Sequence, residues 1–278
     1  AGGIGPLVSL LTNGSSTGKE RAASALWHLS VDEANQVAVA KAGGIAPLVA
    51  QLDDGTPQGT VFAADALANL AVDNPDNQAQ IAKKLVGLVD TSVSPAAQCR
   101  AAHALWELAT KNEGAPVRIV NAGAISPLVA LLGHGTLQAK TEAVGVLSTL
   151  AFGDCTSQLA IATGLVALLG AGSAEAQEHV SQMLVDLAQS AENRAAIVEA
   201  GAIGRLVLQL KGGGETSVRA QELAASVLLH LAGDSMQIVD DIVAEGGLKT
   251  LIALLSFDSG EAPARAAAVL AVIARRSP

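Results

Sequence analysis

The chain has 278 residues, of which 50% are hydrophobic, 15% charged and 2% aromatic. This composition excludes a disordered chain, which is typically poor in hydrophobic and rich in charged residues. The 26 acidic against 17 basic residues leave a net charge of −9, which argues against binding to nucleic-acid phosphates. One of the longest apolar runs, Ala266–Ala274, is far shorter than the roughly 18 residues of a membrane span. We expect a buried helix there, and no membrane insertion.

Two features predict the compartment. Cys99 and Cys155 are the two cysteines, and a chain with a large core does not need the disulfide that they could form. The first residues, Ala-Gly-Gly-Ile, lack an initiator methionine, a basic segment and a signal-peptide cleavage pattern. The sequence therefore predicts a reduced, intracellular protein in the cytoplasm, with the nucleus as an alternative.

The chain is one unit repeated. The segment Ala1-Gly-Gly-Ile-Gly-Pro-Leu-Val recurs in related form from Ala42, Ala122 and Ala200. A second motif, Ala-Leu-Trp-His-Leu in its first copy, ends at seven positions spaced by 41, 38, 42, 37, 44 and 42 residues: Leu29, Leu70, Leu108, Leu150, Leu187, Leu231 and Ile273. A period near 40 with apolar residues at helical spacing indicates a helical solenoid.

Each unit is predicted to contain three helices. Gly43 ends a short first helix, as glycine commonly does just past a helix C-terminus. Pro47 lies near the start of the second helix, where its missing N–H costs little. The third helix is the longest, for instance Gly59–Val72, and residues 73–76 form a turn before the next first helix, Asn77–Lys83. No alternating strand pattern is present, so the predicted class is all-α.

The pattern of residues 25–49, Ala-Leu-Trp-His-Leu through Ala-Gly-Gly-Ile-Ala-Pro-Leu-Val, closely resembles armadillo repeats, especially those of plant and protist arrays. The resemblance covers nearly the whole chain and implies a right-handed α-solenoid of three-helix repeats. HEAT repeats have a similar length, but the glycine and proline placement favours armadillo. Units three and five depart from the pattern, because residues 83–85 and 162–164 replace the Ala-Gly-Gly-Ile-x-Pro segment.

The predicted domain organisation is a single array over residues 1–278, with six full repeats and an N-terminal half repeat that lacks its first helix. Terminal repeats normally carry a polar outer cap, and neither end shows an obvious one. We therefore expect an excised array or a segment of a longer protein.

Helical geometry separates a buried from an outward face on each third helix. Ala22, Leu26 and Leu29 form one stripe, and Trp27 with its neighbours falls on the opposite side. The armadillo resemblance implies that third helices line a concave groove that binds partners. The outward positions predicted to bind a peptide or partner are Ser24, Trp27, His28, Asp65, Asn69, His103, Trp106, Glu107, Thr149, Gln182, Asp186 and His230.

Three features of this surface carry hypotheses. Trp27 and Trp106 occupy one register position two repeats apart, either as exposed hot-spot residues or packed sideways against the next third helix. Asn69 matches the armadillo asparagine whose amide clamps a peptide backbone, since an amide both donates and accepts. Import adaptors resembling this fold carry a tryptophan four residues before that asparagine. Asp65 occupies that position, so an import receptor is the less favoured alternative.

The acids Asp65, Glu107 and Asp186 suggest a partner with some lysine or arginine. Against this, basic residues lie one turn earlier on the same helices and could neutralise the acids: Arg21, Arg100 and Arg265. Both alternatives stay open at this stage. The histidines lack four-residue spacing to one another, so no metal or other cofactor is expected.

Catalysis is not expected. The segment Gly14-Ser-Ser-Thr-Gly18-Lys19-Glu20 has too few residues between its glycines and the wrong last residue for a phosphate loop. No nucleophile motif, zinc motif or cysteine cluster is present. The sequence predicts a non-catalytic scaffold or adaptor that binds an extended peptide or a partner helix in its groove. The alternative is a structural rod that joins a larger assembly through its outer faces.

Overall fold

The computed structural model describes residues 2–89, 94–169, 173–213, 216–233, 236–256 and 260–276. Within these ranges all regular secondary structure is helical, in eighteen helices. The chain divides into two compact units, Ala1–Leu131 with Gly135–Leu150, and Leu132–His134 with Ala151–Pro278. This confirms the all-α class.

The first unit contains ten helices in its described residues, the last three residues of α9 being assigned to the second unit. Their bounds are α1 Ile4–Asn13, α2 Ser16–Leu29, α3 Glu33–Lys41, α4 Ile45–Asp54, α5 Pro57–Ala71, α6 Pro75–Val89, α7 Pro95–Lys111, α8 Ala115–Asn121, α9 Ile125–His134 and α10 Leu137–Leu150.

The second unit contains the remaining helices of the part of the chain that is described. Their bounds are α11 Cys155–Leu168, α12 Ala174–Leu187, α13 Ala191–Glu199, α14 Ala202–Lys211, α15 Val218–Ala232, α16 Met236–Ala244, α17 Gly247–Leu254 and α18 Ala262–Arg276.

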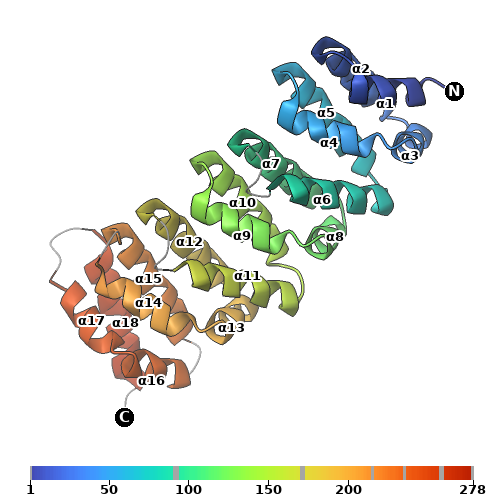
Figure 1. The fold of residues 1–278 in the computed structure, drawn as a ribbon. Helices are drawn as coiled ribbons and strands as arrows, with labels where there is room; N and C mark the ends of the chain where they lie inside the picture. Colours follow the sequence, from blue (N-terminus) through green and yellow to red (C-terminus); the bar gives the residue numbers. More distant parts are fainter. Residues whose placement is uncertain are drawn as a thin grey trace. The chain divides into compact units, whose positions relative to one another are not determined.

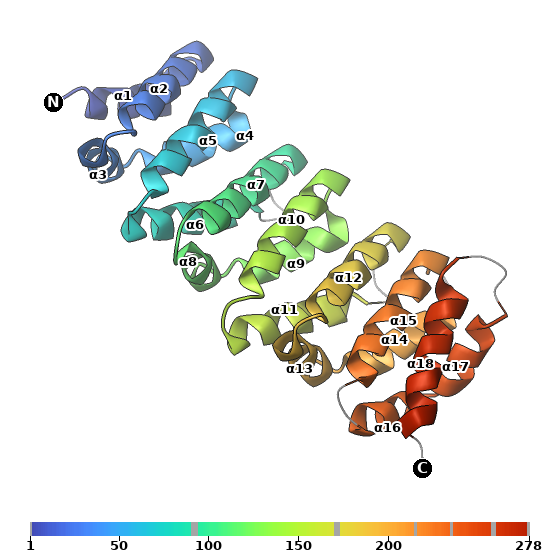
Figure 2. The same ribbon diagram turned by 180° about the vertical axis from the view of Figure 1, so that it is seen from behind.

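In both compact units most repeats follow the predicted order of a short first, a second and a long third helix. Within each unit, the second helices, such as α4 and α14, face the viewer in Figure 1. The third helices, α2, α5, α7 and α10 in the first unit and α12, α15 and α18 in the second, face the viewer in Figure 2. Each unit is thus built as an α-solenoid whose third helices lie side by side on one surface.

The junction between first and second helices depends on glycine. Gly43 and Gly123 have φ angles of +77° and +81°, in the left-handed region that side chains disfavour. Their N–H groups donate to the carbonyl oxygens of Ala40 and Val120, which ends α3 and α8. The prediction that glycine terminates the first helix is confirmed at Gly43, and Gly123 plays the same part in its repeat.

The third and fifth sequence repeats differ from the prediction of three helices. The helix predicted at Asn77–Lys83 runs without a break over Pro75–Val89 as α6, and α11 is equally continuous over Cys155–Leu168. In unit three, Lys83, Lys84 and Leu85 offer no glycine to adopt a positive φ. In unit five, Gly164 is not among the glycines with positive φ. The first and second helices are therefore fused in the third and fifth repeats.

The core follows the predicted stripe, and its alanines let third helices approach closely. Leu26 and Leu105 are fully buried, as are Ala22 and Ala101 at the corresponding positions one turn earlier. In the first unit, α2 packs extensively along α5, and α7 packs along α10. By contrast, α5 contacts α7 much less. The surface of third helices in this unit is therefore not uniform.

Side chains at the helix starts join neighbouring repeats. The Thr56 hydroxyl accepts from the Gly59 N–H and caps α5, while it donates to the Glu20 carboxylate of α2 at 2.6 Å. The Ser94 hydroxyl likewise caps α7 and donates to Asp53 at 3.0 Å. Each of these hydroxyls satisfies its own helix and ties it to the preceding repeat.

Among the described residues, no single helix is both long and apolar enough to cross a membrane. The bent pair α8 and α9, with 81° between its helices, meets the criteria of length and composition only when the two are taken together.

Candidate groove between third helices

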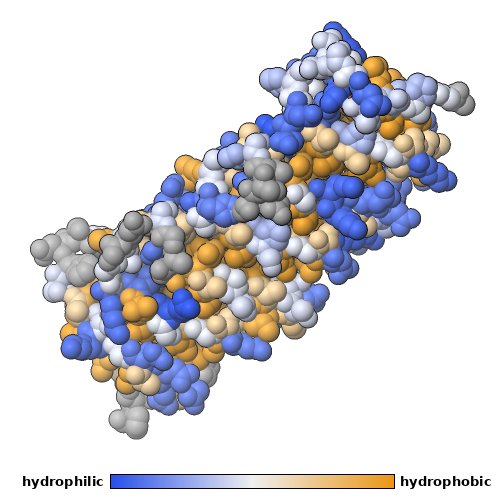
Figure 3. Space-filling view, viewed as in Figure 1, coloured by the Kyte–Doolittle hydropathy of each residue, from blue (hydrophilic) through white to orange (hydrophobic). Residues whose placement is uncertain are grey.

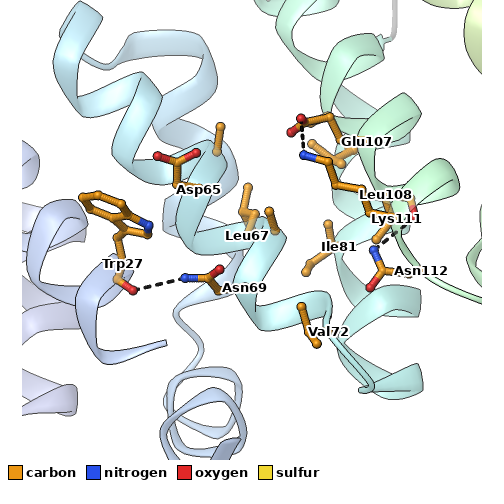
Figure 4. Close-up of a pocket in the computed structure, with 14 residues that line it drawn as sticks. Trp27, Asp65, Leu67, Asn69, Val72, Ile81, Glu107, Leu108, Lys111 and Asn112 are labelled. Carbon is orange, nitrogen blue, oxygen red and sulfur yellow. Dashed lines mark hydrogen bonds and ion pairs between the residues drawn. The ribbon is translucent and has the colours of Figure 1, made fainter. Parts of the chain in front are cut away.

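A groove opens in the first unit between the third helices α5 and α7 (Figure 4). Its volume is about 370 Å³. The groove is lined by residues of α2, α5, α6 and α7 and by the residues that directly follow α5 and α7. They are Trp27, Ala64, Asp65, Leu67, Ala68, Asn69, Val72, Ile81, Leu85, Ala104, Glu107, Leu108, Lys111 and Asn112. It therefore lies on the surface that the armadillo resemblance marks for partner binding.

The fused helix α6 forms the bottom of this groove. It contacts both α5 and α7, and its buried Ile81 and Leu85 line the opening between them. Small side chains at the facing walls, Ala64 and Ala68 of α5 and Ala104 of α7, leave this opening unfilled. The groove thus lies where the third repeat departs from the repeat pattern.

The lower part of the groove is apolar. Leu67, Ile81, Leu85 and Leu108 are each at most 5% exposed, but all contribute to its lining. Val72, just beyond the end of α5, is 48% exposed at its edge. An apolar side chain that enters the groove would therefore be removed from water, which is the main source of favourable free energy in association.

The acids Asp65 and Glu107 lie on opposite walls of the groove, and both are half-buried. Asp65 projects from α5 and Glu107 from α7, and the Lys111 ammonium contacts Glu107 at 2.6 Å (Figure 4). Within the described residues, Asp65 has no hydrogen bond or ion pair of its own. Burial raises the pKa of Asp65, the nearby Glu107 charge raises it further, and Lys111 acts in the opposite direction. Lys111 thus pairs with Glu107, and the Asp65 carboxylate is left without an ion pair among the described residues.

Asn69 is already engaged with the preceding repeat. Its Nδ2 donates to the carbonyl oxygen of Trp27 at 3.4 Å and to the Ser30 hydroxyl at 3.2 Å. The amide oxygen points the other way, toward the groove (Figure 4). Asn69 therefore presents an acceptor to the groove, whereas the clamp expected from the sequence uses both donor and acceptor.

Each tryptophan packs sideways against the next third helix. The Trp27 ring is stacked on Phe62 of α5, with centroids 5.6 Å apart. The Trp106 ring lies against Gly145 of α10, where an added Cβ would be 3.1 Å from the indole. Trp27 also lines the groove, and Trp106 remains 39% exposed. The sideways contact is thus observed for both, and it leaves part of each ring accessible.

The other predicted positions of the first unit lie outside the groove. The Nδ1 atom of His28 contacts the carbonyl oxygen of Ser24 at 2.8 Å. His103 contacts Glu142 of α10 at 3.1 Å, and the Thr149 hydroxyl donates to a backbone carbonyl one turn earlier. These residues have local or inter-repeat contacts and do not join the groove.

The remaining predicted positions belong to the second unit. Gln182 donates to Asp186 on α12 at 3.0 Å, and His230 is half-buried on α15. Gln182 also lines a shallow cleft of about 200 Å³ with Arg219 and Leu223 of α15. This cleft is smaller than the groove of the first unit and lacks its apolar floor.

Sequence reasoning missed the lysine and the floor of the groove. The sequence offers Arg100, with Arg21 and Arg265, as a base that could neutralise the acids, but the Arg100 guanidinium donates to the backbone carbonyl oxygens of Leu52 and Asp53. Lys111 takes that role, and its position four residues after Glu107 was the available signal. Nothing in the repeat pattern indicated that residues of a first helix would line the groove.

The two cysteines are not paired with each other in the structure. Burial raises the pKa of the half-buried Cys99 thiol, and the Glu142 charge adds to this effect. A raised thiol pKa disfavours the thiolate that acts as a nucleophile. Cys155 is exposed at the first residue of α11. In the described ranges, no group of three or more His, Cys, Asp or Glu residues could hold a metal ion.

Comparison with known proteins gives the class. A family model described as Armadillo/beta-catenin-like repeat matches residues 1–31 and 112–152. Vacuolar protein 8 of Candida albicans is 32% identical over 208 residues, which are 72% of this chain and 34% of that protein. The chain thus spans about a third of the length of this relative.

Two solved structures show a similar fold. A crystal structure of an engineered protein is 32% identical and has a TM-score of 0.58, covering 98% of this chain and 68% of the other. A second engineered protein is 23% identical with a TM-score of 0.54, covering 97% and 98%, and shows the fold alone. With the matched repeat model and the repeated helical units, these findings show that the chain belongs to the armadillo-repeat family.

Proposed function

We propose that this chain is a non-catalytic interaction scaffold, and that it holds an extended peptide segment or a helix of a partner protein in the groove between α5 and α7. The observation that supports this most directly is the groove itself, with an apolar floor and polar walls on the surface of third helices. Ligand sites in proteins are typically concave and mostly apolar, with a few polar groups that orient the ligand.

Three contacts support a preformed site. Its α5 wall is fixed from one side by the Trp27–Phe62 stack and by the bond from Asn69 to the carbonyl oxygen of Trp27. Its α7 wall carries the Glu107–Lys111 ion pair. A rigid site loses less conformational entropy on binding, which favours affinity.

Filling the groove tests the proposal. Ala68 lines the wall of α5, and Ala68→Phe would place a ring in the opening. Ala50→Phe adds the same ring on the exposed face of α4, outside the groove, and is the matched control. Peptides are first selected on the wild-type chain from a phage-displayed random library of about twelve residues, and the best binder is then titrated against all three proteins.

We expect Ala68→Phe to weaken the selected peptide by at least about tenfold, a difference of about 1.4 kcal/mol, and Ala50→Phe to leave its affinity unchanged. Circular dichroism of the three proteins verifies that their helical content is equal. Equal affinity for all three proteins, or no peptide selected at all, would contradict the proposal.

A second candidate function is a structural component that joins an assembly through its outer faces. Leu208 of α14 and Ile252 of α17, two helices in contact, are 60% and 53% exposed. Figure 3 shows apolar side chains among hydrophilic ones over these helices. Leu208→Asp with Ile252→Asp should abolish assembly of such a component, measured by light scattering of its complex, and should leave peptide titrations unchanged.

A further inference from the structure

We infer that the segment bound between α5 and α7 carries one large apolar side chain and, within two positions of it, a lysine or arginine. This inference rests on the proposed function and specifies the chemistry of its ligand. The apolar side chain would enter the opening above Ile81 and Leu85, and the basic group would bind Asp65, alone or with Glu107.

The apolar part follows from the floor and the size of the groove. Leu67, Ile81, Leu85 and Leu108 have no polar side-chain atom to offer to a ligand, and they meet at the bottom of an opening of about 370 Å³. The alanines at its walls leave room for a branched or aromatic side chain. A polar side chain placed there would lose its bonds to water without gaining a partner from these four leucines and isoleucines.

The basic part follows from the charge of the walls. Asp65 and Glu107 are the two carboxylates of the lining, and Lys111 is paired with Glu107. Asp65 has no such partner among the described residues. A ligand ammonium or guanidinium at Asp65 would supply the missing positive charge, and it would meet a chain whose net charge of −9 attracts basic segments in general.

The spacing follows from the arrangement of floor and walls. Asp65 and Glu107 are half-buried on the two walls, whereas the apolar side chains of the lining that carry the argument, Leu67, Ile81, Leu85 and Leu108, are buried. In an extended peptide, neighbouring side chains point to opposite sides and residues advance by about 3.4 Å each. A residue that reaches the floor therefore has its first neighbours directed out of the groove, whereas its second neighbours, about 7 Å along the chain, are directed back toward the walls that carry the acids.

The test is a thermodynamic cycle on the peptide selected in the previous experiment. In that peptide, each Lys or Arg is changed to Gln, and each large apolar residue to Ala. The peptides are titrated by fluorescence anisotropy against the wild-type chain, against the Asp65→Asn, Glu107→Gln double variant, and against Glu33→Gln. Glu33 is an exposed acid at the start of α3, outside the groove, and its variant is the control.

We expect the basic-to-Gln change to weaken binding at least about fivefold to the wild-type chain and to Glu33→Gln, but less than about twofold to the double variant. The change of the apolar residue to Ala should weaken binding to all three proteins at least about tenfold. The effect of the basic residue should also decrease with added salt, because exposed charges are screened.

Different results overturn different parts. If the selected peptide is lost with Ala68→Phe but has no basic residue, or if its basic residue has the same effect on the double variant as on the wild-type chain, this inference is wrong and the proposed function stands. If the apolar-to-Ala change has no effect, the inference is equally wrong. If no peptide depends on the groove, the proposed function fails together with the inference.

Discussion

The indole of Trp27 is stacked on the ring of Phe62, with an angle of 23° between the two planes. These residues lie on α2 and α5, so the stack joins the third helices of two neighbouring repeats. Because Trp27 also lines the groove, the same contact that stabilises the array fixes one part of its binding surface.

Phe62→Ala should remove this stack. Truncation of a half-buried aromatic residue leaves a gap and loses its ring contact, and we expect the free energy of unfolding to fall by about 1–2 kcal/mol. The chain has two tryptophans and no tyrosine, so tryptophan emission reports directly on the site. In a Trp106→Phe background, emission of Trp27 should shift to longer wavelength with Phe62→Ala. Unchanged emission would mean that the stack does not persist in solution.

Asp65→Asn should stabilise the protein at neutral pH. Burial and the Glu107 charge raise the pKa of Asp65 in the folded state, so the folded protein holds this proton more tightly than the unfolded chain. The contribution of Asp65 to stability is then fully present below its ordinary pKa and is lost as the pH rises through the raised value. An asparagine does not titrate and avoids this loss.

Urea unfolding at about pH 3 and about pH 7 measures this difference. We expect wild type and Asp65→Asn to be closest in stability at the lower pH, with the variant gaining relative to wild type as the pH rises. A variant that is less stable than wild type at neutral pH would show that the Lys111 charge dominates at Asp65. If Asp65→Asn is instead more stable and also loses affinity for basic peptides, Asp65 serves binding and lowers the stability of the fold.

Thr56→Val should lower the free energy of unfolding, because it removes the hydrogen bonds by which Thr56 caps α5 and joins it to the preceding repeat. Valine has nearly the same shape but can neither cap the Gly59 N–H nor donate to Glu20. Loss of an N-cap typically costs about 1–2 kcal/mol, and the carboxylate loses its donor as well. Thr56→Ser keeps the hydroxyl and should retain most of the stability. Chemical denaturation of the three proteins gives the comparison, and equal losses for Val and Ser would point to packing instead.

Two helical glycines should respond differently to alanine. An added Cβ at the exposed Gly87 of α6 meets no atom within 4 Å, whereas at Gly145 of α10 it lies 3.1 Å from Trp106. Alanine is a better helix former than glycine by about 0.5–1 kcal/mol, so Gly87→Ala should raise the free energy of unfolding by about that amount. Gly145→Ala should gain less and should shift the emission of Trp106, because the indole has to move. Identical effects at both positions would contradict the close contact.

The sequence predicts much of this architecture because its signals are local. Positive φ at Gly43 and the burial of Leu26 both follow from residue type and spacing, and both are observed. The groove, by contrast, depends on contacts between different helices. Residues 83–85 depart from the repeat pattern. That α6 then continues and lines an opening between α5 and α7 depends on its contacts with four other helices, α4, α5, α7 and α8. Lys111 differs from the groove in this respect, because its position four residues after Glu107 is a local signal that is visible within one helix and not in the register shared between repeats.

The continuity of α6 should therefore control the groove. Lys84 is exposed in the middle of this helix, so Lys84→Ala removes a charge without disturbing packing. Lys84→Pro removes one backbone hydrogen bond and places a ring against the preceding turn, at a cost of about 3 kcal/mol. We expect Lys84→Ala to retain the affinity for the selected peptide and Lys84→Pro to weaken it by at least about tenfold, under conditions where circular dichroism shows both proteins folded. If Lys84→Pro is folded and binds as wild type does, the fused helix is a variation of the repeat that the groove does not need.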